Sequence, residues 1–401
     1  MLLEYSLLDH HSYVWAVTPD SIEGFQLPPR AEIEKSANRI VKSLADRNRL
    51  VDGETSAQWD RRHRQAEAEF NTASAELSEK IIRPLAPLLG TKRLVVVADG
   101  ALQLVSFAAL PLPAKIGETP RRLIDDHEIV YEPSASVLAL QRTEMANRTR
   151  APHAVAILAN PVFDTDDPRV VALTKRNPSS SAQAKSNALT SPEIATRRGD
   201  VSRALEDLGL ERFPRLPSSA VEARKIVNLA PKGESKSATD FDASRETAVS
   251  KDLADYRIVH FATHAMVDYE HPELSGIVLS LVDRQGQPRD GYLRLHDIYN
   301  LNLPADLIVL SACQTGVGKE IKGEGLIALT RGFMYAGAER VVASLWKVED
   351  VATAELMAEF YKQMFVNSRR PAAALREAQI ALAKKRSPVD WAGFVLQGEW
   401  K

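Results

Sequence analysis

Two apolar stretches decide the fold: YRIVHFA at residues 256–262 and ADLIVLSA at residues 305–312. Continuous apolar character over such a length predicts a strand that is buried on both faces, as in a parallel sheet covered by helices. A reactive side chain follows each stretch: His264 stands two residues after the first, and Cys313 stands directly after the second. Because the carboxyl ends of parallel strands meet at one edge of a sheet, we expect this imidazole and this thiol to lie near each other.

Elements that alternate between strand and helix surround these two stretches. Apolar runs predict further strands at residues 154–161, 276–282 and 339–346. Apolar residues at helical spacing predict helices at residues 221–229, 323–336, 350–366 and 371–385. The expected architecture is therefore an α/β fold with a mostly parallel, twisted sheet between helices. Residues 164–203, which are rich in polar residues and contain three prolines, predict a surface loop.

The first 150 residues predict a separate α+β part of the chain. Apolar and aromatic residues predict a hairpin of two strands, at residues 2–17 and 21–27, and helices over residues 29–44 and from residue 66 to about 90. Residues 94–112 predict a strand, an Asp99-Gly100 turn and a second strand, and residues 127–133 predict another strand. We therefore expect two domains, residues 1–150 and residues 151–401, with both reactive residues in the second.

Composition excludes several classes of function. The 401 residues include 51 Lys plus Arg against 53 Asp plus Glu, a formal net charge of -2, so nucleic acid is not an expected partner. No run approaches the ~18 apolar residues of a membrane span, and the first residues lack the positive charge of a secretory signal. The single cysteine excludes an intramolecular disulfide and a zinc-binding thiolate cluster, which favours a soluble, cytoplasmic protein. We expect neither a cofactor nor a metal ion.

A thiol beside an imidazole suits attack on a carbonyl group. The thiolate is the nucleophile, and the imidazole both favours the thiolate and returns a proton to the leaving amine. Taken alone, a cysteine after an apolar strand is usually a small buried hydrophobe. The segment QTGVGKEIKGEG at residues 314–325 favours the functional interpretation of Cys313, because its four glycines allow main-chain amides to point outward.

Other residues offer weaker alternatives. His260 and His264 have the four-residue spacing of helical metal ligands, but they lie in a β-favouring run, so we interpret His260 as a buried structural residue. His271, in the charge-rich loop that follows, remains a competing base. A phosphatase-type loop would need arginine where Lys319 stands, and neither a phosphate-binding GxxxxGK motif at Cys313 nor a GxSxG motif is present.

The residues around His264 and Cys313 resemble a CHAT domain. The resemblance lies in VHFATHAMVDYEHPELSGIVLSL at residues 259–281, in LIVLSACQTGVGKEIKGEGLIALTRGFMYAGAERVVASLWKVED at residues 307–350, and in the helix that follows. CHAT domains are a bacterial family of caspase-like cysteine peptidases, related to separases and legumains and often fused to tetratricopeptide repeats. His264 precedes Cys313 by 49 residues, close to the ~50 that separate the two residues in caspases.

This resemblance implies a fold and a set of catalytic roles. The fold would be a caspase-like three-layer sandwich with a mostly parallel central sheet, preceded by a noncatalytic, pseudo-caspase-like N-terminal half. His264 would be the general acid and base, Cys313 the nucleophile, and the main-chain amides of Cys313 and Ala265 would hold the oxyanion. Many relatives have glycine where this chain has Ala265.

The same resemblance implies a pocket for the P1 side chain of the substrate. It would involve Ser311, Ser344 and Trp346. In separase-like relatives an acidic residue in this region binds a basic P1 side chain, which makes Glu349 and Asp350 candidates. From the residues alone, Asp350 fits a helix cap equally well, Glu349 fits a solvated surface residue, and Trp346 fits a core residue.

The expected function is that of a cytoplasmic cysteine endopeptidase acting on a protein substrate. A partner, or a fused tetratricopeptide-repeat region, would regulate it. The alternative is a catalytically latent or inactive caspase-like signalling scaffold, because such sites often need loop ordering before they work. A start at Met1 directly into the hairpin fits either a stand-alone protein or a piece of a longer, repeat-bearing one.

Overall fold

The computed structural model describes residues 1–49, 51, 53–113, 121–145, 148–176, 212–267, 274–311, 313–315 and 324–400. The chain divides into two compact units, which are described separately. The first comprises Met1–Arg148, Leu345–Val348 and Asn367–Lys401, and the second comprises Thr149–Ser344 and Glu349–Val366. The first boundary falls close to residue 150, whereas two later segments group with the N-terminal unit.

A sheet with the strand order β3-β2-β1-β4-β5-β15 organises the first unit. Its strands are β1 (Leu2–Ser6), β2 (Ser12–Val17), β3 (Ile22–Leu27), β4 (Leu94–Val97), β5 (Ile129–Tyr131) and β15 (Phe394–Gly398). β1 to β3 pair antiparallel, whereas β1, β4, β5 and β15 pair parallel. Residues 2–17, expected as one strand, form two, because the polar Asp9-His10-His11 segment separates them.

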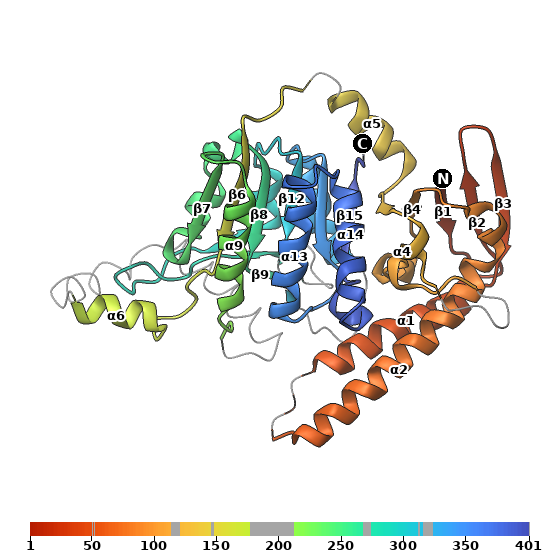
Figure 1. Cartoon of the computed structure of the whole chain (residues 1–401), viewed down its shortest axis with the longest axis horizontal. Coiled ribbons are helices and arrows are strands. Elements are labelled where there is room, and N and C mark those ends of the chain that lie inside the picture. Colours follow the sequence, from red (N-terminus) through yellow and green to blue (C-terminus); the bar gives the residue numbers. More distant parts are fainter. Residues whose placement is uncertain are drawn as a thin grey trace. The chain divides into compact units, whose positions relative to one another are not determined.

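Two long helices of the first unit, α1 (Arg30–Asn48) and α2 (Ser56–Ile81), lie side by side (Figure 1). Their apolar stripes are buried, including Ile40 of α1 and Phe70 of α2. The expected helix to residue 90 is interrupted after α2, because prolines follow in η1 (Arg83–Leu85) and α3 (Ala86–Leu89). The other helices of this unit are α4 (Leu123–Asp126), α5 (Ala135–Met145), α14 (Pro371–Ala383) and η7 (Pro388–Asp390).

The prediction of a second strand within residues 94–112 is wrong. Two 3-10 helices, η2 (Gly100–Leu104) and η3 (Phe107–Ala109), follow β4 instead. Gly100 has a φ of 55°, which turns the chain out of the strand. The Tyr131 hydroxyl accepts a hydrogen bond from the Phe107 N–H at 2.7 Å, so the buried main chain finds a partner outside a sheet.

A fully parallel sheet with the order β14-β12-β8-β6-β7 organises the second unit. Its strands are β6 (His153–Ala159), β7 (Ser235–Thr239), β8 (Tyr256–Ala262), β12 (Leu307–Leu310) and β14 (Arg340–Ser344). Every described residue of β12 and β14 is buried, as the apolar runs predict. The central strands match the predicted segments closely, and β8 matches its segment to the residue.

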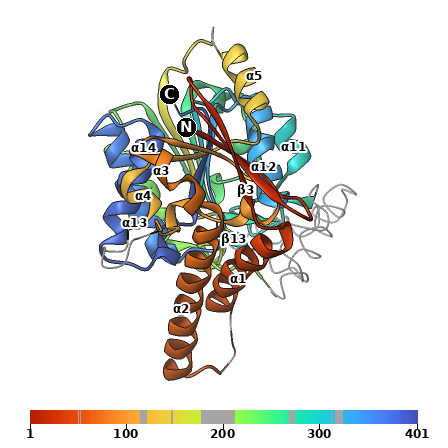
Figure 2. The ribbon, with the colours of Figure 1, turned by 90° about the vertical axis from the view of Figure 1, so that its right-hand side faces the viewer.

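Helices cover both faces of this parallel sheet. On one face α9 (Pro217–Leu229) packs against α13 (Asp350–Phe365) (Figure 1), and on the other α11 (Leu295–Tyr299) packs against α12 (Glu324–Tyr335). Figure 2 shows α13 on one side of the molecule and α11 with α12 on the other. Short elements complete the unit: α6 (Pro168–Arg176), η4 (Asp240–Asp242), α10 (Arg245–Ala248) and η5 (Lys251–Asp255). The expected mostly parallel α/β fold with helical layers is confirmed.

A smaller sheet, ordered β11-β10-β9-β13, lies beyond the carboxyl ends of β8 and β12. Its strands are β9 (His264–Met266), β10 (Gly276–Val278), β11 (Tyr292–Arg294) and β13 (Cys313–Thr315). Residues 276–282, expected as one strand, contribute only β10, which pairs antiparallel with both neighbours. The segment expected as a loop at 164–203 contains the helix α6, and its residues 177–203 lie outside the described residues.

None of the helices within the described ranges is long and apolar enough to cross a lipid bilayer.

Candidate active site

The main chains at His264 and Cys313 lie opposite each other. β8 and β12 are in register, with Phe261 opposite Leu310, and the chain leaves both strands at the same edge of the parallel sheet. The next segments, β9 and β13, pair parallel with Cys313 opposite His264. Neighbouring strands are separated by about 4.8 Å. Main-chain hydrogen bonding therefore brings the two positions side by side although 49 residues separate them.

The imidazole of His264 is buried and held from three directions. Its ring centroid lies 5.1 Å from that of Phe163 and 5.5 Å from that of Phe213. Its Nε2 lies 2.7 Å from the carbonyl oxygen of Pro214. A carbonyl oxygen only accepts, so Nε2 carries the hydrogen, and in the neutral ring Nδ1 is the basic nitrogen.

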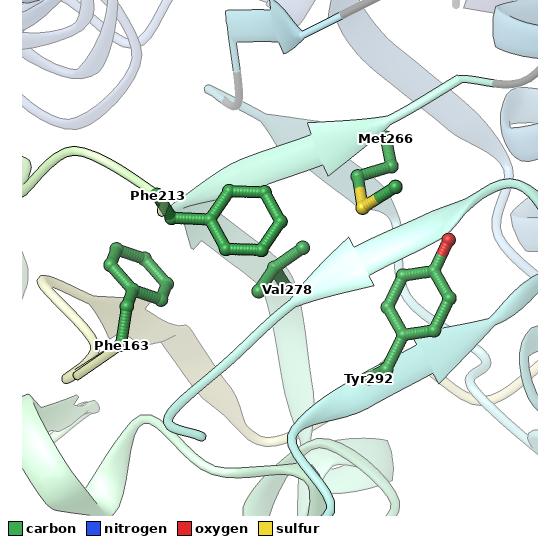
Figure 3. Packing of buried hydrophobic residues seen from close by; sticks show 5 residues of the cluster. All are labelled: Phe163, Phe213, Met266, Val278 and Tyr292. Carbon is green, nitrogen blue, oxygen red and sulfur yellow. The ribbon is translucent and has the colours of Figure 1, made fainter. Parts of the chain in front are cut away.

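The two phenylalanine rings that contact this histidine belong to an apolar cluster at the small sheet (Figure 3). The cluster contains Phe163, Phe213, Met266, Val278 and Tyr292, all of them buried. An apolar wall lowers the local dielectric, which strengthens any hydrogen bond or charge interaction at the neighbouring imidazole. The arrangement suits proton transfer by a histidine with a defined orientation.

Ala265 and Ser311 both belong to hydrogen-bonded main chain. Ala265, in the middle of β9, lies opposite Ile277 of β10 and Gln314 of β13. It is not among the described non-glycine residues with positive φ, so alanine fits this position without strain. Ser311 is buried, and its N–H donates to the Phe261 carbonyl oxygen at 3.0 Å, which extends the β8–β12 ladder by one residue.

The remaining residues expected at the substrate pocket have different surroundings. Ser344 ends β14 and is 1% exposed. Trp346 is buried in the first unit, where its indole N–H donates to the Val389 carbonyl oxygen at 2.8 Å and its ring meets Phe70 edge-on. Glu349 is exposed and occupies the N-cap position of α13, without a side-chain cap hydrogen bond.

Asp350 caps a helix other than its own. Its Oδ2 accepts a hydrogen bond from the Ser218 N–H at 3.1 Å, near the start of α9. Burial raises the pKa of the Asp350 carboxyl, and the charge of Glu222 adds to this, whereas the hydrogen bond from Ser218 opposes it. The sequence allowed a cap or a pocket role for Asp350, and the structure shows a tertiary cap on α9.

His260 is buried within the second unit, as the sequence indicates. It is 0% exposed, with its Nδ1 2.9 Å from the Tyr361 hydroxyl and its Nε2 2.7 Å from Glu222 Oε1. These three side chains come from β8, α9 and α13. The buried trio therefore joins both helices of one layer to the sheet.

Two of the features expected near His264 and Cys313, residues 316–323 of the glycine-rich segment and the competing base His271, lie outside the described residues. Within the described ranges, no group of three His, Cys, Asp or Glu residues could hold a metal ion. The contact between Pro214 and His264 was not predicted from the sequence, because Pro214 takes part through its main-chain carbonyl group, which every residue possesses.

Comparisons with known proteins agree with this architecture. A family model described as CHAT domain matches residues 71–399. Tetratricopeptide repeat protein 28 from Homo sapiens is 38% identical over 105 residues, and its Mus musculus counterpart is 35% identical over 113 residues. These matches cover 25% and 27% of this chain but only 4% of each relative.

Solved structures share the fold at low identity. Two crystal structures of the Saccharomyces cerevisiae separase-securin complex give TM-scores of 0.61 and 0.55, with 10% and 11% sequence identity. Each match covers 99% of this chain and 30% of the matched chain. At this identity the likeness concerns the fold alone.

Proposed function

This chain belongs to the CHAT domain family, and on that premise we propose that it is a cysteine endopeptidase acting on a protein substrate through His264 and Cys313. The observation that supports this most directly is the β9–β13 register, which pairs the main chains of these two residues. The hydrogen bond from His264 to Pro214 gives further support, because it leaves Nδ1 as the basic nitrogen of the neutral ring. Residues 1–150 would form a noncatalytic supporting half.

The proposed reaction is acyl transfer through a thioester. His264 Nδ1 accepts the thiol proton of Cys313, and the thiolate attacks the carbonyl carbon of the scissile amide to form a C–S bond. The main-chain amides of Cys313 and Ala265 stabilise the oxyanion. The imidazolium then protonates the amine as the C–N bond breaks. A water molecule, deprotonated by His264, cleaves the thioester and releases the new carboxyl terminus.

For substrate selection we propose Ser311 and Ser344 as pocket residues and Glu349 as the residue that binds a basic P1 side chain. Glu349 is favoured over Asp350 because it is exposed, whereas the Asp350 carboxylate already accepts the hydrogen bond from α9. A peptide library varied at P1 tests this choice. Preference for Arg or Lys that is lost in Glu349→Gln supports the assignment, and an apolar preference removes both acidic residues from the pocket.

We propose a tetratricopeptide-repeat region as the regulator and the cytoplasm as the location. The similarity to tetratricopeptide repeat protein 28 supports the first proposal. The single cysteine, which fits a reducing compartment, supports the second.

The test of the peptidase proposal combines cleavage with covalent labelling. Wild type, Cys313→Ala and His264→Ala are assayed on a fluorogenic peptide library and with a peptidyl acyloxymethyl ketone, alone and with a tetratricopeptide-repeat partner. Because Cys313 is the only cysteine, any thioether adduct identifies its site. His296→Ala, which alters an exposed histidine on α11, is the matched control and is expected to cleave like wild type.

We expect both dyad variants to lose cleavage and to keep the thermal stability of the control. Cleavage by Cys313→Ala at the wild-type rate would contradict the assignment. A wild-type protein that is neither labelled nor active under any of these conditions would instead support the alternative, a catalytically inactive scaffold.

A further inference from the structure

Two loops that are distant in sequence hold the His264 ring. The first, residues 160–167, follows β6 and contributes Phe163. The second, residues 212–216, precedes α9 and contributes Phe213, which stacks on the imidazole with an interplanar angle of 29°, as well as the Pro214 carbonyl oxygen. Whatever fixes the second loop against the first therefore fixes the orientation of this imidazole.

Asp167 joins the two loops. This side chain is 3% exposed, and its carboxylate accepts hydrogen bonds from the Arg169 N–H at 2.8 Å and from the Arg169 guanidinium at 2.7 and 2.9 Å. From the second loop, Arg215 Nε lies 3.2 Å from Asp167 Oδ2. Burial opposes ionisation, but the hydrogen bonds and charge of Arg169, with a contribution from Arg215, lower the pKa of the Asp167 carboxyl. The pair is therefore ionic at neutral pH.

Arg169 anchors the first loop to the parallel sheet. Its Nη1 donates to the Asn160 carbonyl oxygen at 2.7 Å and to Asp240 Oδ1 at 2.6 Å. Asn160 and Asp240 follow the neighbouring strands β6 and β7, and both have positive φ, 52° and 57°. Non-glycine residues keep such a backbone only where their surroundings determine it. The first loop thus provides a fixed base for the Asp167 carboxylate.

The two ends of the second loop are attached differently. At its downstream end, Ser219 Oγ donates to the Leu216 carbonyl oxygen at 2.7 Å and accepts from the Asn160 N–H at 3.0 Å. At its upstream end, Arg212 pairs with Asp166 at 2.5 Å, but these side chains are 63% and 64% exposed, and exposed pairs contribute little. The Arg215–Asp167 pair is the charged contact next to Pro214 in the sequence.

We propose, on the basis of the peptidase function above, that Asp167 and Arg215 are positioning residues: their ion pair holds the Pro214 carbonyl against His264 and thereby sets the imidazole tautomer. Without the pair, the loop at Pro214 retains its downstream attachment but loses its link to the Asp167 carboxylate. The carbonyl then no longer selects the form of His264 in which Nδ1 is basic, and the fold remains intact.

The test compares Arg215→Met with Arg212→Met in the full chain. Each variant removes one guanidinium and keeps a long side chain, but only the first breaks the contact with Asp167. Selective ¹⁵N-histidine labelling shows which ring nitrogen carries the hydrogen, and His264→Gln identifies the signal among the nine histidines. The pH profile of Cys313 alkylation by iodoacetamide and the separate values of kcat and KM complete the measurements.

In wild type and Arg212→Met we expect the Nε2-protonated tautomer. In Arg215→Met we expect mixed tautomers, an alkylation profile moved to higher pH, and kcat about tenfold lower with KM nearly unchanged. Arg215→Lys keeps the charge and is expected to restore most of the wild-type signal. Asp167→Asn provides a second variant should Arg215→Met fold poorly.

A His264 spectrum in Arg215→Met that matches wild type overturns the positioning proposal, whatever the activity. Altered tautomers in a protein whose wild type neither cleaves nor is labelled would support the positioning role and reject the peptidase function. The two proposals therefore fail separately.

Discussion

Glu132 gives the first unit a stability that falls as the pH rises. It follows β5, is 5% exposed, and neither of its carboxyl oxygens has a hydrogen-bond partner among the described residues. Arg142 does not neutralise it, because that guanidinium pairs with Glu399 at 2.5 Å. Burial, together with the charge of Glu399, raises the pKa of Glu132 from 4.5 to about 8, against the opposing effect of Arg142.

The sign and size of the effect follow from this raised pKa. Between pH 4.5 and 8 the folded chain keeps the Glu132 proton that the unfolded chain releases, so stability is fully present below that window and decreases as the pH rises through it. A tenfold change in the acid dissociation constant corresponds to about 1.4 kcal/mol, so the free energy of unfolding falls by about 5 kcal/mol across the whole window. Glu132→Gln removes the titration while keeping shape and polarity.

Urea unfolding of wild type and Glu132→Gln at pH 5.5 and pH 8.5 measures the difference. From pH 5.5 to pH 8.5 we expect the free energy of unfolding of the variant to rise by several kcal/mol relative to wild type. The dependence of that free energy on urea concentration is expected to stay the same. Glu23→Gln, at an exposed position of the same unit, is the control and is expected to track wild type. Stability curves of Glu132→Gln and wild type that stay parallel across this range would refute the reasoning.

Three further substitutions test the packing described above. Tyr361→Phe leaves the buried Nδ1 of His260 without its partner and is expected to cost about 1–3 kcal/mol in urea unfolding. Trp346→Phe removes the indole hydrogen bond to Val389, at a cost of about 1 kcal/mol, and an unchanged urea midpoint would contradict the assigned contact. Gly291→Ala would place a methyl group against the Ser280 carbonyl oxygen and is expected to destabilise the fold by about 2 kcal/mol. A melting temperature equal to that of wild type would argue against this close approach.

The sequence predicted the central strands well because their burial is nearly complete. Continuous apolar runs at β8 and β12 have few alternatives other than an internal parallel strand. Those two runs also indicated where His264 and Cys313 leave the sheet, since parallel neighbours end at the same edge. The pairing of their main chains follows from two regular strands in register.

Apolar runs were misleading where the main chain found partners outside a ladder. Residues after Gly100 are as apolar as a strand, yet the Tyr131 hydroxyl accepts the Phe107 N–H, and the chain folds into 3-10 turns. Periodicity alone cannot separate these two outcomes for a short buried segment. The same limit applies to residues 276–282, of which only β10 is a strand.

Tertiary partners of polar groups were beyond the reach of sequence patterns. Asp350 stands at a helix start, which suggested a cap on its own helix, but its carboxylate accepts a hydrogen bond from α9, which begins 133 residues earlier in the chain. The contact between His264 and Pro214 likewise joins residues 50 apart through a main-chain oxygen. Neither relation leaves a trace in spacing or composition.

The small sheet aligns His264 with Cys313 but contributes little to the stability of the fold. β9 and β13 meet over three residue pairs, whereas the parallel strands β6, β8, β12 and β14 contribute most of the buried strand residues of this unit. Separation of β9 from β13 would therefore lower the free energy of unfolding only slightly. A preparation could therefore have a normal melting temperature and still carry out the proposed reaction slowly. A melting curve measures the stability of the parallel sheet and does not report whether His264 and Cys313 are aligned.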